Sequence, residues 1–338
     1  MSTIFKTCRI CGSQGHHPAY DVREMMFGTR ESFRYFQCSA CGCLQIDEIP
    51  ADLGRFYPPD YYSFSLQAPP HEHGTLYRWL QKQRCRTALF GKGYKLNSWL
   101  KSWVELPAAL HDRLGGSPPK EILARCGLKS YSTRFLDVGC GAHSKWLAAL
   151  ANLGFRHLIG ADPFIPADQK HGNIRIFKRE LDDIDGKFDL ITLHHSLEHI
   201  PDQLALLKAV HARLEKGGTC LVRIPLVSSH VWEKYGVNWV ELDAPRHLYL
   251  HSVDSITNLG RQAGLELYDV IYDSLAFEFY GSEQYLRDIP LKDPRSMWVN
   301  PDSDLFTSAE KEDFELMAAR VNAERSGGRA GFYFRAQS

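Results

Sequence analysis

Short apolar runs alternate with helical segments from Tyr131 to the C-terminus, and this alternation constrains the fold most strongly. The runs are apolar along their length, which is typical of strands buried on both faces of a parallel sheet. Helices between such strands cover the two faces of the sheet. We therefore predict an α/β domain whose last two strands form an antiparallel edge. The segments are TRFLDVG, a helix at about 144–152, HLIGAD, IRIF, FDLITL, a helix at 201–214, TCLVRIP, LELYDVIYD and RAGFYFRA.

A glycine-containing loop, Asp137–His143, follows the first of these strands. Glycines at this place let the backbone approach a ligand closely. Asp137 would repel the diphosphate of a dinucleotide, and Ser144 replaces the third glycine of the dinucleotide fingerprint. The carboxylate instead suits a cationic ligand that carries an ammonium and a sulfonium. Asp162 ends the next strand, where an acidic side chain accepts hydrogen bonds from ribose hydroxyls.

Two cysteine pairs near the N-terminus have the spacing of metal ligands. Cys8 and Cys11 form the first pair, Cys38 and Cys41 form the second, and a glycine follows each pair. Two such pairs close a tetrahedral site of four thiolates, which predicts a structural zinc. The alternative is a set of buried free thiols. Other possible ligands nearby are Cys43, His16 and His17.

Residues 73–104 contain seven Lys and Arg side chains and no Asp or Glu. Leucines and tryptophans are interleaved with these charges, and the pattern predicts two short helices separated at residues 91–93. A basic helix with tryptophans can lie on an anionic membrane surface with weak affinity. Alternatively, the tryptophans pack on the main domain and the basic face is solvated. We favour the second interpretation.

Composition limits the organisation and the partners of the chain. Its 338 residues include 40 Lys+Arg and 40 Asp+Glu, and this balance argues against nucleic-acid binding. No signal peptide or membrane span is recognisable, so we expect a cytoplasmic protein. We predict a zinc module at 1–70, a basic bridge at 71–119 and a main domain at 120–338. An insertion at about 274–325 would cover the substrate pocket, and the aromatic run at 56–64 forms either a lid or a docking surface.

Four motifs in the main domain, in this order, resemble those of class I S-adenosylmethionine-dependent methyltransferases: FLDVGCG, IGADP, FDLITLHHSLEHIPD and LEKGGTCLVRIP. The N-terminal module is similar to the zinc-binding domain that precedes sugar C-methyltransferases. The resemblance implies a Rossmann-like sheet and S-adenosylmethionine as cofactor. The residues that it places around the cofactor are Asp137, Gly139, Cys140, Gly141, Asp162, Glu180, Asp182, His194 and His195.

A segment beyond the fifth strand, residues 241–252, resembles the HEHL segment of sugar C-methyltransferases. His247 matches its second histidine, whereas Arg246 stands in place of its glutamate, so C-methylation of a keto-sugar is not implied. Methyl transfer to a hydroxyl needs a base near neutral pKa. Our candidates are His247 first and His195 second, with Glu241 or Asp243 as orienting carboxylates. Arg246 is a candidate partner for an anionic acceptor.

The leading hypothesis is a methyltransferase that acts on a small molecule, such as a sugar or a nucleotide sugar. Two alternatives remain. An inactive methyltransferase-like scaffold would recruit a protein partner or a membrane, but the intact acidic and glycine residues of the cofactor loop weigh against it. A nucleic-acid methyltransferase is disfavoured by the neutral charge and by the lack of an Asn-Pro-Pro-Tyr or Cys-Pro motif after the fourth strand.

Overall fold

The computed structural model describes residues 2–57, 75–111, 117–128 and 130–337. These residues form two compact units, neither of which is a continuous piece of chain. The first unit consists of Met1–Pro58, His195–Leu207 and Val222–Gln337. The second consists mainly of Pro59–His194 and Lys208–Leu221.

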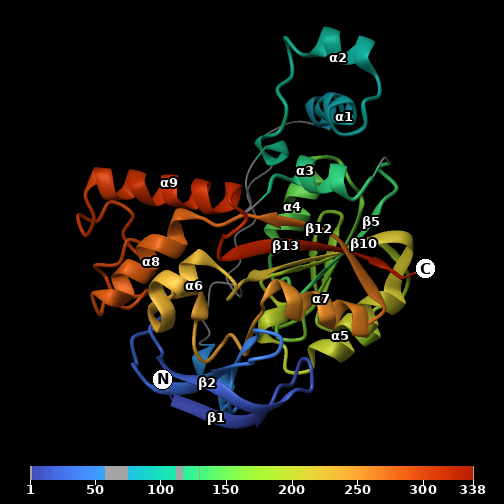
Figure 1. Cartoon of the computed structure of the whole chain (residues 1–338). Helices are drawn as coiled ribbons and strands as arrows, with labels where there is room; N and C mark the ends of the chain where they lie inside the picture. Colours follow the sequence, from blue (N-terminus) through green and yellow to red (C-terminus); the bar gives the residue numbers. More distant parts are fainter. Residues whose placement is uncertain (1, 58–74, 112–116, 129, 338) are drawn as a thin grey trace. The chain divides into compact units, whose positions relative to one another are not determined.

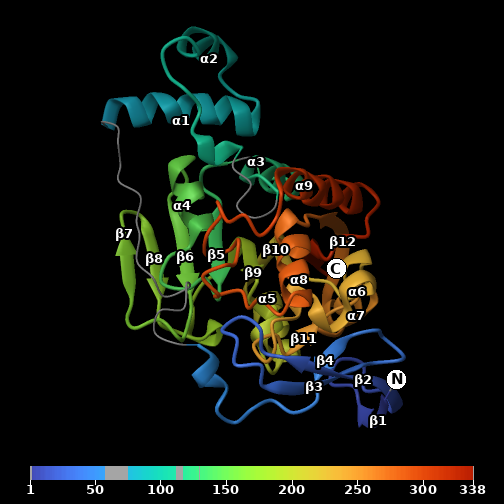
Figure 2. The same ribbon diagram turned by 90° about the vertical axis from the view of Figure 1, so that its left-hand side faces the viewer.

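A parallel sheet forms the core of the second unit (Figures 1 and 2). Its central strand β5 pairs in parallel with β6 on one side and with β9 on the other, and β6 pairs in parallel with β8. The short edge strand β7 runs antiparallel to β8 and was not predicted. The strands are β5 (Arg134–Val138), β6 (His157–Ala161), β7 (Gln169–His171), β8 (Ile174–Phe177) and β9 (Phe188–His194). The helices α3 (Pro119–Arg125) and α4 (Lys145–Asn152) belong to the same unit.

The predicted strands form because their side chains are apolar on both faces. Phe135, Leu136, Leu190 and Ile191 are fully buried in β5 and β9. Ser144 caps the helix α4, since its hydroxyl accepts a hydrogen bond from the amide of Leu147. The glycine loop thus leads directly from β5 into a capped helix.

Strand β10 (Leu214–Pro225) is shared by the two units, because its residues up to Leu221 belong to the second unit and the rest to the first. Beyond β10, strands β13 (Arg329–Ala336) and β12 (Leu265–Tyr272) pair antiparallel. The strand order of the whole sheet is β12-β13-β10-β9-β5-β6-β8-β7. The predicted Rossmann-like sheet with an antiparallel end is confirmed.

Among the described residues, the α-helix α5 directly precedes β10 in the chain and four α-helices follow it, of which α6 (His230–Tyr235) is the first. The insertion between β12 and β13 contains α8 and α9. The bounds of the others are α5 (Gln203–Arg213), α7 (Val253–Gln262), α8 (Ala276–Leu286) and α9 (Ser308–Ala323).

A second, antiparallel sheet lies in the first unit (Figure 2). The two cysteine pairs lie in the loops that follow its strands β1 and β3. Residues 44–46, directly after the second cysteine pair, form the buried strand β4. Its outer neighbour β11 comes from about two hundred residues later in the chain, and this pairing was not predicted. The strands in order are β1 (Ser2–Thr7), β2 (Gln14–Arg23), β3 (Ser32–Gln37), β4 (Leu44–Ile46) and β11 (Tyr249–Leu250).

The basic bridge contains the two predicted helices, α1 (Thr75–Phe90) and α2 (Tyr94–Leu100), which contact each other (Figure 1). The favoured interpretation, in which the tryptophans pack on the main domain, is wrong. Trp79, Trp99 and Trp103 are 54%, 66% and 77% exposed. None of the described helices is both long enough and apolar enough to span a membrane.

The aromatic run at 56–64 lies mostly outside the described residues. Its first two members are described. Phe56 is buried against Phe33 in the short 3-10 helix η1 (Leu53–Phe56), and the hydroxyl of Tyr57 lies 3.0 Å from His199 Nδ1.

Candidate functional site

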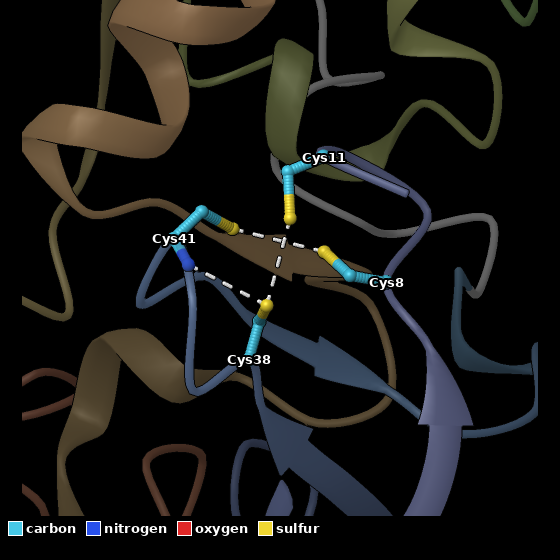
Figure 3. Close-up of side chains that lie close together, drawn as sticks. All are labelled: Cys8, Cys11, Cys38 and Cys41. Atoms are coloured by element: carbon cyan, nitrogen blue, oxygen red, sulfur yellow. Dashed lines mark hydrogen bonds between the residues drawn. The ribbon is translucent and has the colours of Figure 1, made fainter. Parts of the chain in front are cut away.

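The four predicted metal ligands come together in the first unit (Figure 3). Cys8 Sγ lies 3.7 Å from Cys41 Sγ, and Cys11 Sγ lies 3.6 Å from Cys38 Sγ. In a tetrahedral zinc site, bonds of about 2.3 Å separate the sulfurs by about 3.8 Å. The cluster therefore fits a four-thiolate zinc site, and no histidine is needed to complete it.

The two cysteine pairs share one backbone geometry. In each pair the amide of the first cysteine donates to a carbonyl five residues later, and the following glycine donates back to the first cysteine. Gly12 and Gly42 adopt φ of 74° and 72°, which disfavours other residues there. Amides of Ile10 and Cys41 point at the sulfurs of Cys8 and Cys38. Such donors stabilise thiolates, which a metal ion requires.

The cysteine-bearing sheet also holds the segment that contains His247. β11, which follows His247, pairs with β4. The buried hydroxyl of Tyr35 donates to the carbonyl of His247 at 2.8 Å. The hydroxyl of Ser252 donates to the carbonyl of Cys41. The position of His247 therefore depends on the cysteine module.

A buried carboxyl group, that of Glu198, lies beside three histidines in the first unit. His195 Nδ1 is 3.5 Å and His247 Nε2 is 4.0 Å from Glu198 Oε1, and the His199 ring is 4.7 Å from the His247 ring. Glu198 is fully buried, and within the described part of the chain neither of its carboxyl oxygens has a hydrogen-bond partner. Burial raises the pKa of Glu198 to about 8. Burial and the neighbouring His247 lower the pKa of His199 to about 3, so His199 is neutral at pH 7.

The protons on His247 and His199 can be assigned from their partners. His247 Nδ1 lies 2.7 Å from the carbonyl oxygen of Glu241, and His199 Nδ1 lies 3.0 Å from that of Arg246. Because a carbonyl can only accept, each histidine carries its proton on Nδ1 when neutral. The lone pair of His247 is then on Nε2, which also lies 3.9 Å from Asp243 Oδ2.

Glu198, His199 and His247 also form a possible donor set for a cation, with one donor atom of each within 4.8 Å of the others. A metal with bonds of about 2.1 Å would hold its donors about 3.0–3.4 Å apart. The 4.0 Å between His247 and Glu198 is longer than this, whereas the cysteine sulfurs meet their expected spacing. The spacing of the histidine cluster therefore fits a metal ion less well than that of the cysteine cluster does.

The carboxylates predicted to orient His247 are both bound to arginines. Asp243 accepts two hydrogen bonds from Arg246, which outweigh burial and lower the pKa of Asp243. The Glu241 carboxylate lies 3.3 Å from Arg329 Nη1, so Glu241 contacts His247 through its backbone carbonyl. Arg246 is fully buried and binds both Asp243 and Glu24. The hypothesis that Arg246 binds an anionic acceptor is therefore wrong.

Asp137, in the second unit, organises the predicted cofactor loop. Its oxygens accept hydrogen bonds from the hydroxyls of Thr192 at 2.7 Å and Ser144 at 2.6 Å. Burial raises the pKa of Asp137 to about 6 despite these two donors. Asp137 therefore connects β9 and the N-terminus of α4 to the loop, and a cationic ligand nearby would favour its charged form.

Asp162 and the loop glycines fit a nucleoside-containing ligand. Asp162 Oδ2 accepts from the amide of Gly141 at 2.8 Å, and Oδ1 accepts from that of Phe164 at 2.9 Å. Each oxygen keeps a lone pair that a ribose hydroxyl can use. Gly139 and Gly141 have φ of 69° and 65°, in the left-handed region that favours glycine. Both features match the chemistry expected of a nucleoside site at the end of β5 and β6.

The other predicted cofactor residues have the following surroundings. Cys140 packs on β6, where a β-carbon on Gly160 would be 2.6 Å from its sulfur. Glu180 is exposed, and the exposed Asp182 lies 3.3 Å from Arg213 Nη1. His194 ends β9 with its ring beside that of Trp146. His195 follows it in the chain and belongs to the first unit.

A hollow of about 240 Å³ in the second unit lies at the amino ends of β5 and β6, whereas the cofactor loop follows their carboxyl ends. Ligands bind at the carboxyl ends of such strands, so this hollow is not the candidate cofactor site. Its lining includes Arg134, Arg156, His157, Arg175 and Lys187.

The roles of Glu198, His199 and Tyr57 were not predicted. The sequence shows Glu198 and His199 in LEHIPD, but a carboxyl group next to a histidine is common on protein surfaces. Their burial and their proximity to His247 depend on segments about fifty residues apart in the chain. No local pattern could show this.

Comparisons with known proteins identify the domain. Residues 104–270 match the model of a family described as a methyltransferase domain. No curated protein matches the sequence. The family match shows that the chain carries a class I S-adenosylmethionine-dependent methyltransferase domain and is a methyltransferase. The family also implies S-adenosylmethionine as the cofactor.

Solved structures of low sequence identity are also similar to the chain. One is a chain of the complex between the Haloferax volcanii Trm112 methyltransferase activator and a methyltransferase; identity is 18%, coverage is 65% of this chain and 88% of that one, and the TM-score is 0.42. Haemonchus contortus phosphoethanolamine N-methyltransferase 2 is 16% identical, with coverage of 64% of this chain and 52% of that one and a TM-score of 0.39. The CcbJ methyltransferase of Streptomyces caelestis is 12% identical, with coverage of 61% of this chain and 84% of that one and a TM-score of 0.36. The assignment rests on the family match.

Proposed function

We propose that this chain, which carries a class I methyltransferase domain, methylates a hydroxyl group of a small neutral acceptor such as a sugar, with His247 as the base. The observation that supports this proposal is the His247 side chain, whose Nδ1 proton is held by the Glu241 carbonyl. Its Nε2 lone pair is therefore available to take a proton.

The surroundings of His247 favour this role. Asp243 is held in its charged form by Arg246 and lies 3.9 Å from His247 Nε2. A negative charge at this distance stabilises the imidazolium that forms when His247 accepts a proton. His195, our second candidate, lies beside Glu198 in the same unit.

The second unit supplies the residues proposed to hold the cofactor, apart from His195, which belongs to the first unit. S-adenosylmethionine, when bound, supplies a methyl carbon activated by a sulfonium. In this proposal Asp162 accepts hydrogen bonds from the ribose. The backbone of Gly139 and Gly141 borders the methionine end, and Asp137 is the nearby negative charge. The remaining proposed contacts are Cys140, Glu180, Asp182, His194 and His195.

A neutral acceptor is favoured because the cationic side chains around the cluster are already paired. Arg246 binds Asp243 and Glu24, Arg223 binds Asp273, and Arg329 lies against Glu241. A phosphate or carboxylate group would need a positive partner to be buried there. A sugar hydroxyl needs only a hydrogen-bond acceptor and a base.

We also propose that the cysteine cluster holds a structural zinc. Four cysteine ligands saturate a tetrahedral ion and leave no position for substrate. The metal would stabilise a small sheet and, through Tyr35 and β11, the segment of His247.

Radiolabelled S-adenosylmethionine and a panel of neutral sugars, nucleotide sugars and sugar acids test the proposal. We expect label transfer to a neutral hydroxylated acceptor. Label transfer only to acidic acceptors would contradict the neutral-acceptor proposal. Calorimetry with S-adenosylmethionine tests the alternative of an inactive scaffold. Absence of cofactor binding would contradict the proposed enzyme and favour the scaffold.

A further inference from the structure

The hairpin of α1 and α2 exposes more bulky apolar surface than any other described segment of its length. Its exposed large apolar side chains are Leu76, Trp79, Leu96, Trp99 and Trp103, with exposures from 40% to 77%. Four of them follow helical spacing, because Leu76 and Trp79 are three residues apart in α1 and Leu96 and Trp99 are three apart in α2, whereas Trp103 follows the end of α2. Side chains at these spacings share one face of a helix. Such clusters on a surface indicate a binding partner.

The exposed side chains belong to a well-connected hairpin. Arg84 bonds to Asn97 and to the carbonyl of Val104, and the hydroxyl of Thr87 donates to the carbonyl of Lys92. Lys82 lies over the ring of Tyr131, 4.4 Å from its centre. α1 also contacts α3. These contacts fix the hairpin through its polar and half-buried residues, and they leave the tryptophans outside.

The charge of the hairpin specifies the partner. Residues 75–104 contain seven Lys and Arg and no acidic residue, in a chain whose net charge is zero. Lys82 and Arg84 serve the internal contacts above, and five basic side chains remain exposed. These are Arg78, Arg86, Lys92, Lys95 and Lys101.

We propose that the α1–α2 hairpin docks the protein on a membrane surface that contains anionic lipids. Tryptophan favours the boundary between lipid headgroups and acyl chains, and lysine and arginine bind the anionic headgroups. A membrane fits the hairpin better than a nucleic acid does, because a phosphate backbone cannot bury the exposed aliphatic side chains of Leu76 and Leu96. The hairpin lies on the surface and does not cross the bilayer, in keeping with the lengths of its helices.

Vesicle flotation of the full-length protein tests this proposal. We expect the protein to float with vesicles of phosphatidylglycerol and phosphatidylcholine, to float poorly with phosphatidylcholine alone, and to dissociate at high salt because screening weakens the charge attraction. Absence of flotation with the anionic vesicles at low salt would overturn the proposal.

Two sets of variants separate the apolar and the basic contributions. Trp79→Ala, Trp99→Ala and Trp103→Ala combined should lower vesicle binding at least about tenfold. Replacing Lys92, Lys95 and Lys101 by Gln should lower binding about fivefold per lysine. The matched controls change equally exposed residues elsewhere and should bind like the wild type. They are Phe164→Ala for the apolar set and Lys170→Gln, Lys208→Gln and Lys216→Gln together for the basic set.

Two further measurements identify other outcomes. Circular dichroism and S-adenosylmethionine binding verify that each variant is folded, which is expected because the changed side chains are exposed. Analytical ultracentrifugation tests whether a second copy of the chain covers the hairpin. A dimer that the tryptophan variant dissociates, together with unchanged vesicle binding, would overturn the membrane proposal.

Discussion

Glu198 is a carboxyl group buried without hydrogen-bond partners among the described residues, next to histidines that do have such partners. Burying an unpaired charge is costly, so the protein holds Glu198 in its neutral form at pH 7. A neutral carboxyl can donate a proton, whereas His247 can accept one at Nε2. The cluster therefore contains a proton donor and a proton acceptor 4.0 Å apart.

The raised pKa of Glu198 predicts a pH-dependent effect of Glu198→Gln on stability. In the folded state the carboxyl titrates at about 8, compared with its ordinary value of 4.5. Between these values the folded state binds more protons than the unfolded state, so wild-type stability falls as pH rises. Glutamine is neutral throughout. We expect the melting temperature of the variant, relative to wild type, to increase from about pH 5 to about pH 8 and then to level off.

Calorimetric melting of both proteins across this range checks the prediction. Glu278 has a similarly raised pKa of about 8, but it is present in both proteins and cancels in the difference. If the difference in melting temperature between Glu198→Gln and the wild type stayed constant with pH, Glu198 would have an ordinary pKa.

His247→Asn tests the proposed base. Asparagine can still donate to the Glu241 carbonyl, but it cannot take up a proton, so we expect acceptor methylation to fall by about 10²–10⁴-fold. Affinity for S-adenosylmethionine should be unchanged, because the proposed cofactor residues are different ones. Initial rates and calorimetry measure the two effects. The exposed His157→Asn is the control and should retain activity; an active His247→Asn enzyme would exclude His247 as the base.

At the scale of elements, the pairing of β4 with β11 connects the cysteine module to the segment of His247. The strand β4 could be predicted because Leu44 and Ile46 flank Gln45 directly after a cysteine pair. β11 could not, because it contains only two residues and its partner lies about two hundred residues away. The sequence therefore predicted the cysteine cluster and the strand–glycine-loop–helix segment, which are local patterns, but not the contact that connects the cysteine cluster to His247.

The same limit applies to side chains whose meaning depends on burial. The Asp137 loop was predicted as a unit because its residues are adjacent in the chain. The sequence does not show that Arg246 is fully buried between Asp243 and Glu24, since Glu24 is far away in the chain. The tryptophans of the hairpin were expected to pack on the main domain because one short basic stretch binds a membrane weakly, and only the fold shows that they are exposed.

Loss of zinc should therefore disable methylation more than cofactor binding. Cys38→Ser removes a ligand of the cluster, and a strong chelator removes the metal; either change should disorder the β3–β4 end of the small sheet. The supports of His247 from Tyr35 and β4 would then be lost. We expect acceptor methylation to fall at least about tenfold, with S-adenosylmethionine affinity within about twofold of wild type. Metal analysis should give one zinc per wild-type chain.

Cys43→Ala is the matched control for this variant. Cys43 is buried in the same module but is not a member of the cluster, so zinc content and activity should persist. If Cys38→Ser kept full activity after losing its zinc, the link between the module and His247 would be wrong.

At the scale of the whole molecule, the two compact units are interleaved in sequence. The first unit combines the N-terminal sheet with the C-terminal third of the chain, and β10 contributes residues to both units. The contacts within the first unit include the fully buried pair of Glu24 and Arg246. A boundary placed near residue 119, at the end of the basic bridge, would separate these two partners.

We therefore expect the fragment 120–338 to be unstable, although its sequence contains all the predicted strands of the Rossmann-like sheet. It lacks Glu24, and breaking a buried ion pair by removing one partner costs about 3–5 kcal/mol. It also lacks β4, which pairs with β11, and Tyr35, whose hydroxyl donates a hydrogen bond to the carbonyl of His247. These losses are comparable with a total stability of about 5–15 kcal/mol. Expression and thermal melting of the fragment check this prediction. Glu24→Gln in the full-length chain is the milder variant. A fragment that melts cooperatively near the melting temperature of the full-length protein would show that the main domain folds independently.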